Sequence, residues 1–166
     1  YHLAEHVLTA SRLGVPQRRR RLFVVGTRRR VTLQLDEGEE RAFGPCLDWT
    51  APGWRPITKA TEGAQERMAK GRGNHGQRFL TQHVTGHPGV GLDEPIRTIT
   101  TKDQWCLVDG DRYRPLTVRE LARGQGFDDD FWLPPVARSE AIRGIGNAVP
   151  PPVAKAVVGA VAEVAA

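Results

Sequence analysis

A glutamine followed by four arginines, Gln17-Arg18-Arg19-Arg20-Arg21, has the side chains with the clearest chemical use in this sequence. Side chains alternate between the two faces of a β-strand, so in a strand Gln17, Arg19 and Arg21 share one face and Arg18 and Arg20 the other. Guanidinium groups at the mouth of a cleft can grip a phosphate or a base carbonyl oxygen with paired hydrogen bonds. The alternative is a solvated edge strand whose charges prevent aggregation.

Two strands must place these arginines. Residues 1–10 alternate loosely between two faces, which predicts a first strand. Residues 13–16, Leu-Gly-Val-Pro, predict a turn, and residues 17–26 predict a second strand. The apolar run Leu22-Phe23-Val24-Val25 is typical of a strand that is buried on both faces. The arginines are therefore expected to lead directly into a buried strand.

The middle of the chain, from Arg28 to about Arg112, has a weaker pattern in which Pro, Gly and acidic clusters separate short apolar patches. We expect a small, irregular, strand-rich module here. A short helix fits residues 62–70, and residues 96–101 and 104–108 have the composition of strands.

The last third of the chain predicts three helices. Thr117-Val118-Arg119-Glu120 has the form of a capping box, so a helix should run from about Val118 to Arg123. A second short helix fits Ser139 to Arg143. Three prolines, residues 150–152, then open a last helix, because a proline at the first helical position loses no hydrogen bond.

Composition and charge narrow the class of protein. The chain has 166 residues, enough for one ordinary domain or two small ones, and a net charge of +5. Residues 1–30 contain eight arginines against the single Glu5. This concentration favours a polyanion partner, although an arginine-rich surface that serves solubility would look the same. No apolar run is long enough for a membrane span, and residues 1–6 do not resemble a signal peptide. We therefore expect a cytoplasmic protein without membrane contact.

Several patterns suggest chemistry that their context does not favour. Pro45-Cys46 has no visible group that would stabilise a thiolate. Residues 71–76 match G-x-G-x-x-G, but no strand precedes them, so we expect a flexible loop that offers Arg72, His75 and Arg78 to phosphates. His83 and His87 lie among Gly and Pro with no cysteine pair nearby, and residues 128–130 resemble a solvated acidic loop. We expect no metal site.

Three blocks of the sequence resemble conserved motifs of the bacterial cytosine-5 DNA methyltransferases. The segment Gly14 to Arg21 resembles the eighth motif, which has the form Gln-x-Arg-x-Arg after Gly-[Val/Ile]-Pro. The segment Arg114 to Phe127 resembles the ninth motif, with Asp128 where the family usually has Pro. Gly146 to Ala154 resembles the tenth. The three blocks occur in the family's order, which is a stronger signal than any one of them.

This resemblance implies an α/β fold. Residues 1–30 would be the C-terminal strands of a Rossmann-like S-adenosylmethionine methyltransferase domain, residues 31–136 a small strand-rich target-recognition domain, and residues 137–166 a segment and helix that return to the first domain. It also implies site residues. These are Gln17, Arg19 and Arg21 in the catalytic site, Gly146, Asn147 and Val149 at the cofactor, and Arg18, Arg20, Arg72, Arg78, Arg97, Thr98 and Ile99 on DNA.

The implied reaction transfers a methyl group from S-adenosylmethionine to C5 of a cytosine flipped out of double-stranded DNA. The family's cofactor loop (Phe-x-Gly-x-Gly), nucleophile (Pro-Cys-Gln) and acidic partner (Glu-Asn-Val) are not in this sequence. We therefore expect an N-terminal catalytic half, in the same or a separate chain, to supply them, and the lack of an initiator Met agrees with this. The alternative is a stand-alone or degenerate DNA-binding module without catalysis.

Overall fold

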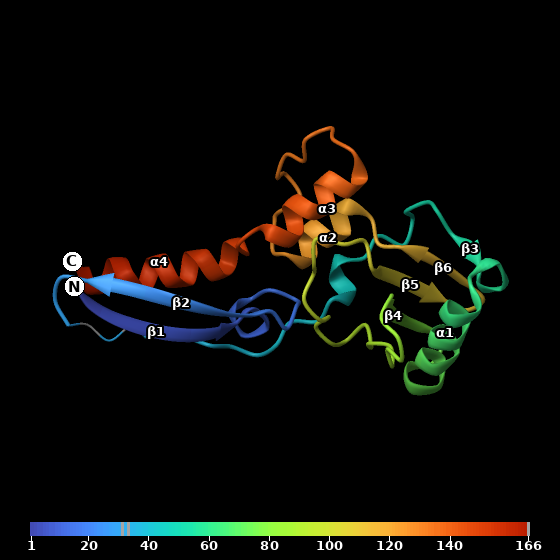
Figure 1. Cartoon of the computed structure of the whole chain (residues 1–166), viewed down its shortest axis with the longest axis horizontal. Helices are drawn as coiled ribbons and strands as arrows, with labels where there is room; N and C mark the ends of the chain where they lie inside the picture. Colours follow the sequence, from blue (N-terminus) through green and yellow to red (C-terminus); the bar gives the residue numbers. More distant parts are fainter. Residues whose placement is uncertain (31, 33, 166) are drawn as a thin grey trace.

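The structure is a computed structural model that describes residues 1–30, 32 and 34–165. The molecule is elongated, with a β-hairpin and the last helix at one end and a mixed body at the other (Figure 1). The start of β1 and the end of α4 lie together at the open end of the hairpin, away from the segment that connects its two strands. The strands are β1 (His2–Thr9), β2 (Arg20–Thr27), β3 (Arg55–Pro56), β4 (Arg78–Gln82), β5 (Trp105–Asp109) and β6 (Arg112–Pro115). The helices are α1 (Glu62–His75), α2 (Val118–Gly124), α3 (Arg138–Asn147) and α4 (Pro151–Ala165), with short 3-10 turns at Ala10–Leu13, Gly44–Cys46 and Ile57–Lys59.

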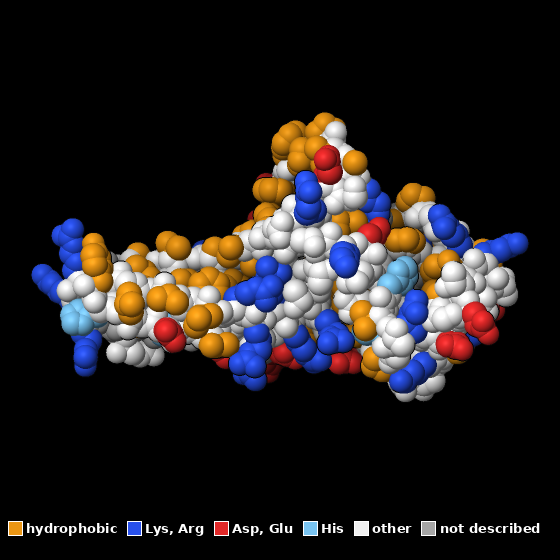
Figure 2. Space-filling model, in the orientation of Figure 1, with side chains coloured by type: hydrophobic (Ala, Val, Ile, Leu, Met, Phe, Trp, Pro, Cys, Tyr) orange, Lys and Arg blue, Asp and Glu red, His pale blue; other side chains and the backbone are white. Residues whose placement is uncertain are grey.

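The hairpin of β1 and β2 buries only one of its two faces. The strands are antiparallel, with Leu8 opposite Arg21, and the covered face packs with α4 in a small core that includes Leu8 and Val153. The other face is exposed over four large apolar side chains, Leu3, Val7, Leu22 and Val24, each more than half exposed. Figure 2 shows apolar side chains along the hairpin. The expectation that Leu22 to Val25 is buried on both faces is therefore wrong for this chain.

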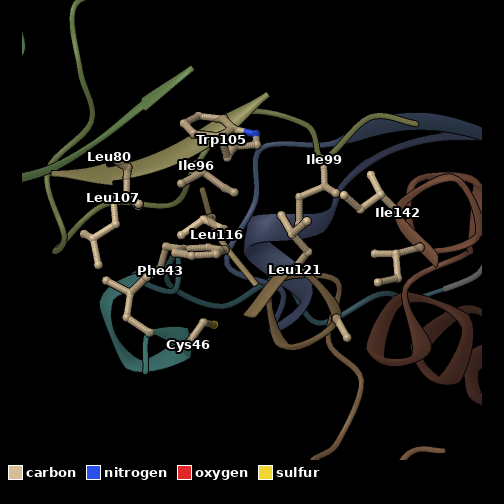
Figure 3. Close-up of a cluster of buried hydrophobic side chains, with 13 residues drawn as sticks. Phe43, Cys46, Leu80, Ile96, Ile99, Trp105, Leu107, Leu116, Leu121 and Ile142 are labelled. Carbon is tan, nitrogen blue, oxygen red and sulfur yellow. The ribbon is translucent and has the colours of Figure 1, made fainter. Parts of the chain in front are cut away.

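The second body has a four-stranded antiparallel sheet in the order β3-β6-β5-β4. The helix α1 packs against β4, with Met68 and Phe79 in the small core between them. On the side toward the hairpin lies the largest core, whose members come from the sheet, the loops and α2 and α3 (Figure 3). The expected strand-rich module is thus present, and it is better ordered than its sequence pattern suggested.

Two local expectations for this body are wrong. Residues 96–101 form no strand and make only an isolated bridge, between Ile96 and Gln17. The expected loop at residues 71–76 is instead the last turns of α1, which continue to His75. A Cβ on Gly71 would lie 2.2 Å from the ring of Phe79, so the glycine is needed for close packing between α1 and β4.

The helix α2 begins with the expected capping box. Thr117 Oγ1 accepts a hydrogen bond from the Glu120 backbone N–H, and the Glu120 carboxylate accepts one from the Thr117 N–H. The same carboxylate accepts two hydrogen bonds from Arg114, at 2.6 and 2.8 Å, and one from the backbone of Asp48. Arg114 and Glu120 are fully buried. This ion pair joins β6, α2 and the loop at Asp48.

The segment that returns to the hairpin begins after α3, whereas it was expected to begin at residue 137. The helix α3 packs on α2, and Ile142 and Ile145 belong to the largest core. The chain leaves this body only at Ala148 to Pro150, and α4 then runs along the hairpin (Figure 1). The helix α3 is therefore packed with the second body, and α4 alone accompanies the strands.

Buried His87 should make folding stability sensitive to pH. Its Nδ1 accepts hydrogen bonds from the backbone of Gln82 and Gly89, and burial, followed by the positive charge of Arg97, lowers its pKa. The unfolded chain therefore binds the proton more readily, so this stability is present above about pH 6.5 and is lost as the pH falls through the lowered pKa. We expect the urea midpoint to fall between pH 7 and pH 5. His87→Asn, which keeps an acceptor without titrating, should flatten this dependence; an unchanged slope would contradict the role of His87.

Candidate functional site

The side chain of Gln17 lies at the junction of the two bodies. It is fully buried, and its Oε1 accepts a hydrogen bond from the Ile99 N–H at 3.0 Å. Its Nε2 donates to the Gly124 carbonyl at 3.1 Å and to Gln125 Oε1, and Gln125 Nε2 donates in turn to the Ala148 carbonyl at 2.6 Å. All of its hydrogen-bonding capacity is directed inward. The expectation that Gln17 shares an outward face with Arg19 and Arg21 is wrong, because residues 17–19 precede the regular strand.

Arg19 ties the same segments together from the other side. Its Nη1 donates to the Gly146 carbonyl at 3.1 Å and to the Ile99 carbonyl at 3.4 Å, while its Nε is buried without a hydrogen-bond partner. Burial, followed by the charge of Arg21, lowers the pKa of the Arg19 guanidinium. An arginine nevertheless keeps its proton near neutral pH. Arg19 is therefore a fixed cation that is partly committed to holding the backbone.

Arg21 is exposed, and its guanidinium is held by fewer backbone contacts than that of Arg19. Among the described residues, its guanidinium makes one hydrogen bond, to the neighbouring Arg20 carbonyl at 2.7 Å. Arg19 and Arg21 both line a cavity of about 220 Å³ between the hairpin and the start of α4. The other residues that line it have apolar side chains, and they are Leu8, Ala10, Leu22, Phe23, Val149, Pro150 and Val153. Two guanidiniums thus face one mostly apolar hollow, where they can bind an oxygen that carries negative charge.

The residues expected to contact DNA divide into two groups. Arg97 and Thr98 line an open cleft together with Arg18, whose guanidinium is paired with Glu40 and Glu94. Ile99, in contrast, is 1% exposed and packs in the largest core (Figure 3). The expectation that Ile99 reads base edges is wrong, because the side chain that follows Thr98 turns inward to join Ile96.

Arg72, Arg78 and Arg20 lie elsewhere. Arg72 donates to Asp111 and the Gly110 carbonyl, and Arg78 pairs with Asp109 and lies over the ring of Trp49. Both belong to the end of the sheet away from the hairpin, and acidic groups hold both. Arg20 is exposed on β2, on the face opposite Arg21.

The structure gives no chemical role to the two cysteines or to a group of possible metal ligands among the described residues. Burial raises the pKa of Cys46 to about 11 and that of Cys106 to about 12, so both are protonated thiols near neutral pH. Within the described ranges, no three His, Cys, Asp or Glu side chains are grouped so that they could hold a metal ion. No described helix is both long and apolar enough to cross a membrane.

The segment Gly146 to Val149 lies beside the two arginines. Gly146 is buried, and a Cβ there would lie 2.4 Å from the carbonyl group of Thr100, so this glycine lets α3 pack against the loop at residues 99–101. Asn147 is exposed, and Val149 is 57% exposed. Gly146 therefore contributes close packing, while the side chains of Asn147 and Val149 are exposed.

Comparison with known proteins shows the family to which the chain that carries these residues belongs. The family model for the C-5 cytosine-specific DNA methylase matches residues 1–84 and 48–163. The chain belongs to the C-5 cytosine-specific DNA methylase family. It is 32% identical to the type II methyltransferase M.AplI of Arthrospira platensis over 95% of this chain and 46% of that protein, and 28% identical to M.BsuRI of Bacillus subtilis over 98% and 42%. This methylase chain thus spans about half the length of the curated relatives it matches.

Solved structures support the α/β methylase fold. The Entamoeba histolytica methyltransferase EhMeth matches with a TM-score of 0.61 at 14% identity, over 99% of this chain and 54% of that one. The Schizosaccharomyces pombe (S. pombe) Dnmt2 methyltransferase matches with a TM-score of 0.58 at 16% identity, over 99% and 58%. At these identities the likeness concerns the fold alone. The expectation of a Rossmann-like methyltransferase architecture is confirmed.

Gln125 is a site residue of this methylase chain that the sequence did not reveal. It lies in the block that resembles the ninth motif, yet nothing in its neighbours indicates that its amide bridges Gln17 to the Ala148 carbonyl. The sequence could have indicated this bridging role only if the three blocks had been known to lie together in space. The amide pair connects all three of them.

The packing role of Gly146 gives a prediction with an internal control. Gly146→Ala places a methyl group against the Thr100 backbone, and we expect it to lower the free energy of unfolding by about 1–3 kcal/mol. Gly144→Ala lies on the same helix with nothing within 4 Å of the added atom, so it should stabilise by about 0.5–1 kcal/mol. Urea unfolding followed by circular dichroism measures both. Equal effects of the two variants would contradict the packing role.

Proposed function

We propose that this chain is the DNA-recognition part of a DNA (cytosine-5)-methyltransferase and that it supports methyl transfer when it is joined to a catalytic half carrying the cofactor loop, the cysteine and the glutamate. The observation that carries the proposal is the convergence of the three motif blocks on one junction. Gln17, Gln125 and the Ala148 carbonyl are joined by hydrogen bonds, and Arg19 adds the Ile99 and Gly146 carbonyls. A DNA-binding module alone would not need this arrangement.

Arg21 is the residue that we place on the substrate. Its exposed guanidinium at the cavity can hold O2 of the flipped cytosine or the adjacent phosphate, where positive charge stabilises electron density that builds up on the ring. Arg19 is assigned a positioning role, because its Nη1 already holds two backbone carbonyls.

S-adenosylmethionine, when bound, supplies the methyl group. We assign Asn147 to its amino-acid end, because this amide is exposed and has a fixed place at the end of α3. Val149 adds apolar surface beside it. Most of the cofactor pocket would come from the other half, so the present residues close the pocket and do not form it alone.

The bare face of the hairpin is where we place the catalytic half. Leu3, Val7, Leu22 and Val24 are exposed on one face of a two-stranded sheet, which is marginal by itself, and Glu5 lies among them. Additional strands and a covering layer would complete it. On this basis residues 1–30 and 150–166 belong to the catalytic domain and the residues between them to the recognition domain, and the completed enzyme would act on cytoplasmic double-stranded DNA.

The proposal is tested by comparing the chain alone with the chain joined to the catalytic half. Transfer of radiolabelled methyl groups to duplex DNA, with nucleoside analysis of the product, should yield 5-methylcytosine only from the completed enzyme. Calorimetry should detect weak or no binding of S-adenosylmethionine by the isolated chain; micromolar affinity would contradict the shared pocket. A completed protein that binds duplex without transferring methyl groups would be a DNA-binding module.

A further inference from the structure

A second hollow, outside the arginine cavity, has a lining suited to a base-pair edge. It is an open cleft of about 640 Å³ bordered by the end of β4, the loop at residues 97–100 and the start of β5. All but one of its lining residues are polar, and they are Arg18, Gln82, Val84, Arg97, Thr98, Thr100 and Gln104. The loop that carries Arg97 and Thr98 is held from below by Ile96 and Ile99, which lie in the core (Figure 3).

Two amides in this cleft are held in complementary orientations. Gln104 Oε1 accepts hydrogen bonds from Thr100 Oγ1 at 3.1 Å and from Gln82 Nε2 at 3.4 Å. The oxygen of Gln104 is thereby used, which leaves its N–H groups to donate. One of the two N–H donors of Gln82 is used in the same contact, and the oxygen of this side chain, which lines the cleft while only 5% exposed, is left to accept. The cleft therefore offers one neutral acceptor and one neutral donor side by side.

Arg97 is the cation available to this cleft. Among the described residues, the ion pairs engage Arg18 with Glu40 and Glu94 but do not include Arg97, which is exposed. A phosphate needs only donors, so a cleft for the backbone would gain nothing from an amide acceptor. The major-groove edge of a G·C pair presents two acceptors on guanine, N7 and O6, and one donor on cytosine, the N4 amino group.

We propose that Arg97 and Gln82 read one G·C pair of the methylation site, Arg97 by donating two hydrogen bonds to guanine and Gln82 by accepting one from cytosine. Gln104 fixes the orientation of Gln82 and offers a donor to the neighbouring base. This inference rests on the proposed methyltransferase function, and it assigns specificity to an arginine and an amide that lie apart in the sequence.

The test uses the enzyme completed with its catalytic half and a library of synthetic duplexes with random bases around a cytosine. Sequencing of methylated products gives the preferred bases of each variant. Wild type should prefer guanine at one fixed position, and Arg97→Ala should reduce that preference about tenfold or more while other positions keep theirs. Gln82→Leu should weaken the same position, and Arg55→Ala, which removes an exposed charge on β3, should leave the preferences unchanged.

Arg97→Lys separates base reading from phosphate binding, because lysine keeps the charge and lacks the two-pronged donor geometry. Loss of the guanine preference in Arg97→Lys supports base reading. If Arg97→Lys keeps the guanine preference, Arg97 contacts a phosphate and the inference is wrong. The inference is also wrong if Arg97→Ala reduces methylation by the same factor for every sequence. A wild-type enzyme that methylates no duplex would contradict the proposed function itself, and the inference would fall with it.

Discussion

Replacing Arg21 with alanine in the completed enzyme is expected to lower the rate of methyl transfer about 100- to 1,000-fold, the usual cost of removing one donor that stabilises charge in a transition state. The guanidinium of Arg21 lies at the cavity with a single hydrogen bond to a neighbouring carbonyl, so it is available to the substrate. Most of the affinity for duplex should remain, because many contacts to the DNA backbone share that energy. Single-turnover methyl transfer at saturating duplex measures the effect.

Arg20→Ala is the matched control, since it removes the same charge from the next residue on the opposite face of β2. It should leave the rate of the bound complex largely unchanged, because Arg20 does not line the cavity. If Arg21→Ala methylates at the wild-type rate, or if both variants lose the rate equally, the role assigned to Arg21 is wrong.

Removing one partner of the Arg114–Glu120 pair should destabilise this chain by about 3–5 kcal/mol, because the remaining charge is left buried without its counterion. The Glu120 carboxylate accepts from Arg114, from the Asp48 N–H and from the Thr117 N–H, so Glu120→Ala also removes the cap of α2. Guanidinium chloride unfolding followed by circular dichroism measures the change in the free energy of unfolding.

A surface ion pair on the same helix provides the comparison. Arg123 pairs with Asp129 at 2.6 Å, but the Asp129 side chain is 67% exposed, so Asp129→Ala should cost less than about 1 kcal/mol. Replacing Arg114 and Glu120 together with Met and Leu should cost much less than the two single variants combined, because no unpaired charge is then buried. A Glu120→Ala variant as stable as Asp129→Ala would refute the importance of the buried pair.

The parts of the fold that the sequence predicted are those encoded by neighbouring residues. The capping box of Thr117 and Glu120 and the prolines at the start of α4 set helix starts through effects within a few residues. The alternation of residues 1–10 predicted β1 in the same way. For the helix starts the stabilising partner is nearby in the sequence, and for β1 the alternation of side chains itself indicates a strand, so the pattern alone was sufficient.

The remaining features depend on partners far away in the chain. Gln17 turns inward because its hydrogen-bond partners are Ile99 and Gln125, and Ile99 turns inward because the core continues beneath it. The glycines at residues 71–76 suggested a loop, yet α1 continues because Gly71 packs on Phe79. Tertiary packing overrides local propensity at these positions, and no local pattern records it.

The alternation of buried and exposed side chains at residues 96–99 has an evolutionary consequence. Ile96 and Ile99 anchor the loop in the core, while Arg97 and Thr98 between them border the open cleft. Substitutions at the two outer positions leave the anchors, and hence the fold, undisturbed, since surface changes away from packed contacts usually alter stability little. If Arg97 reads the target as proposed, new DNA preferences can arise in this segment by single substitutions that leave the scaffold intact.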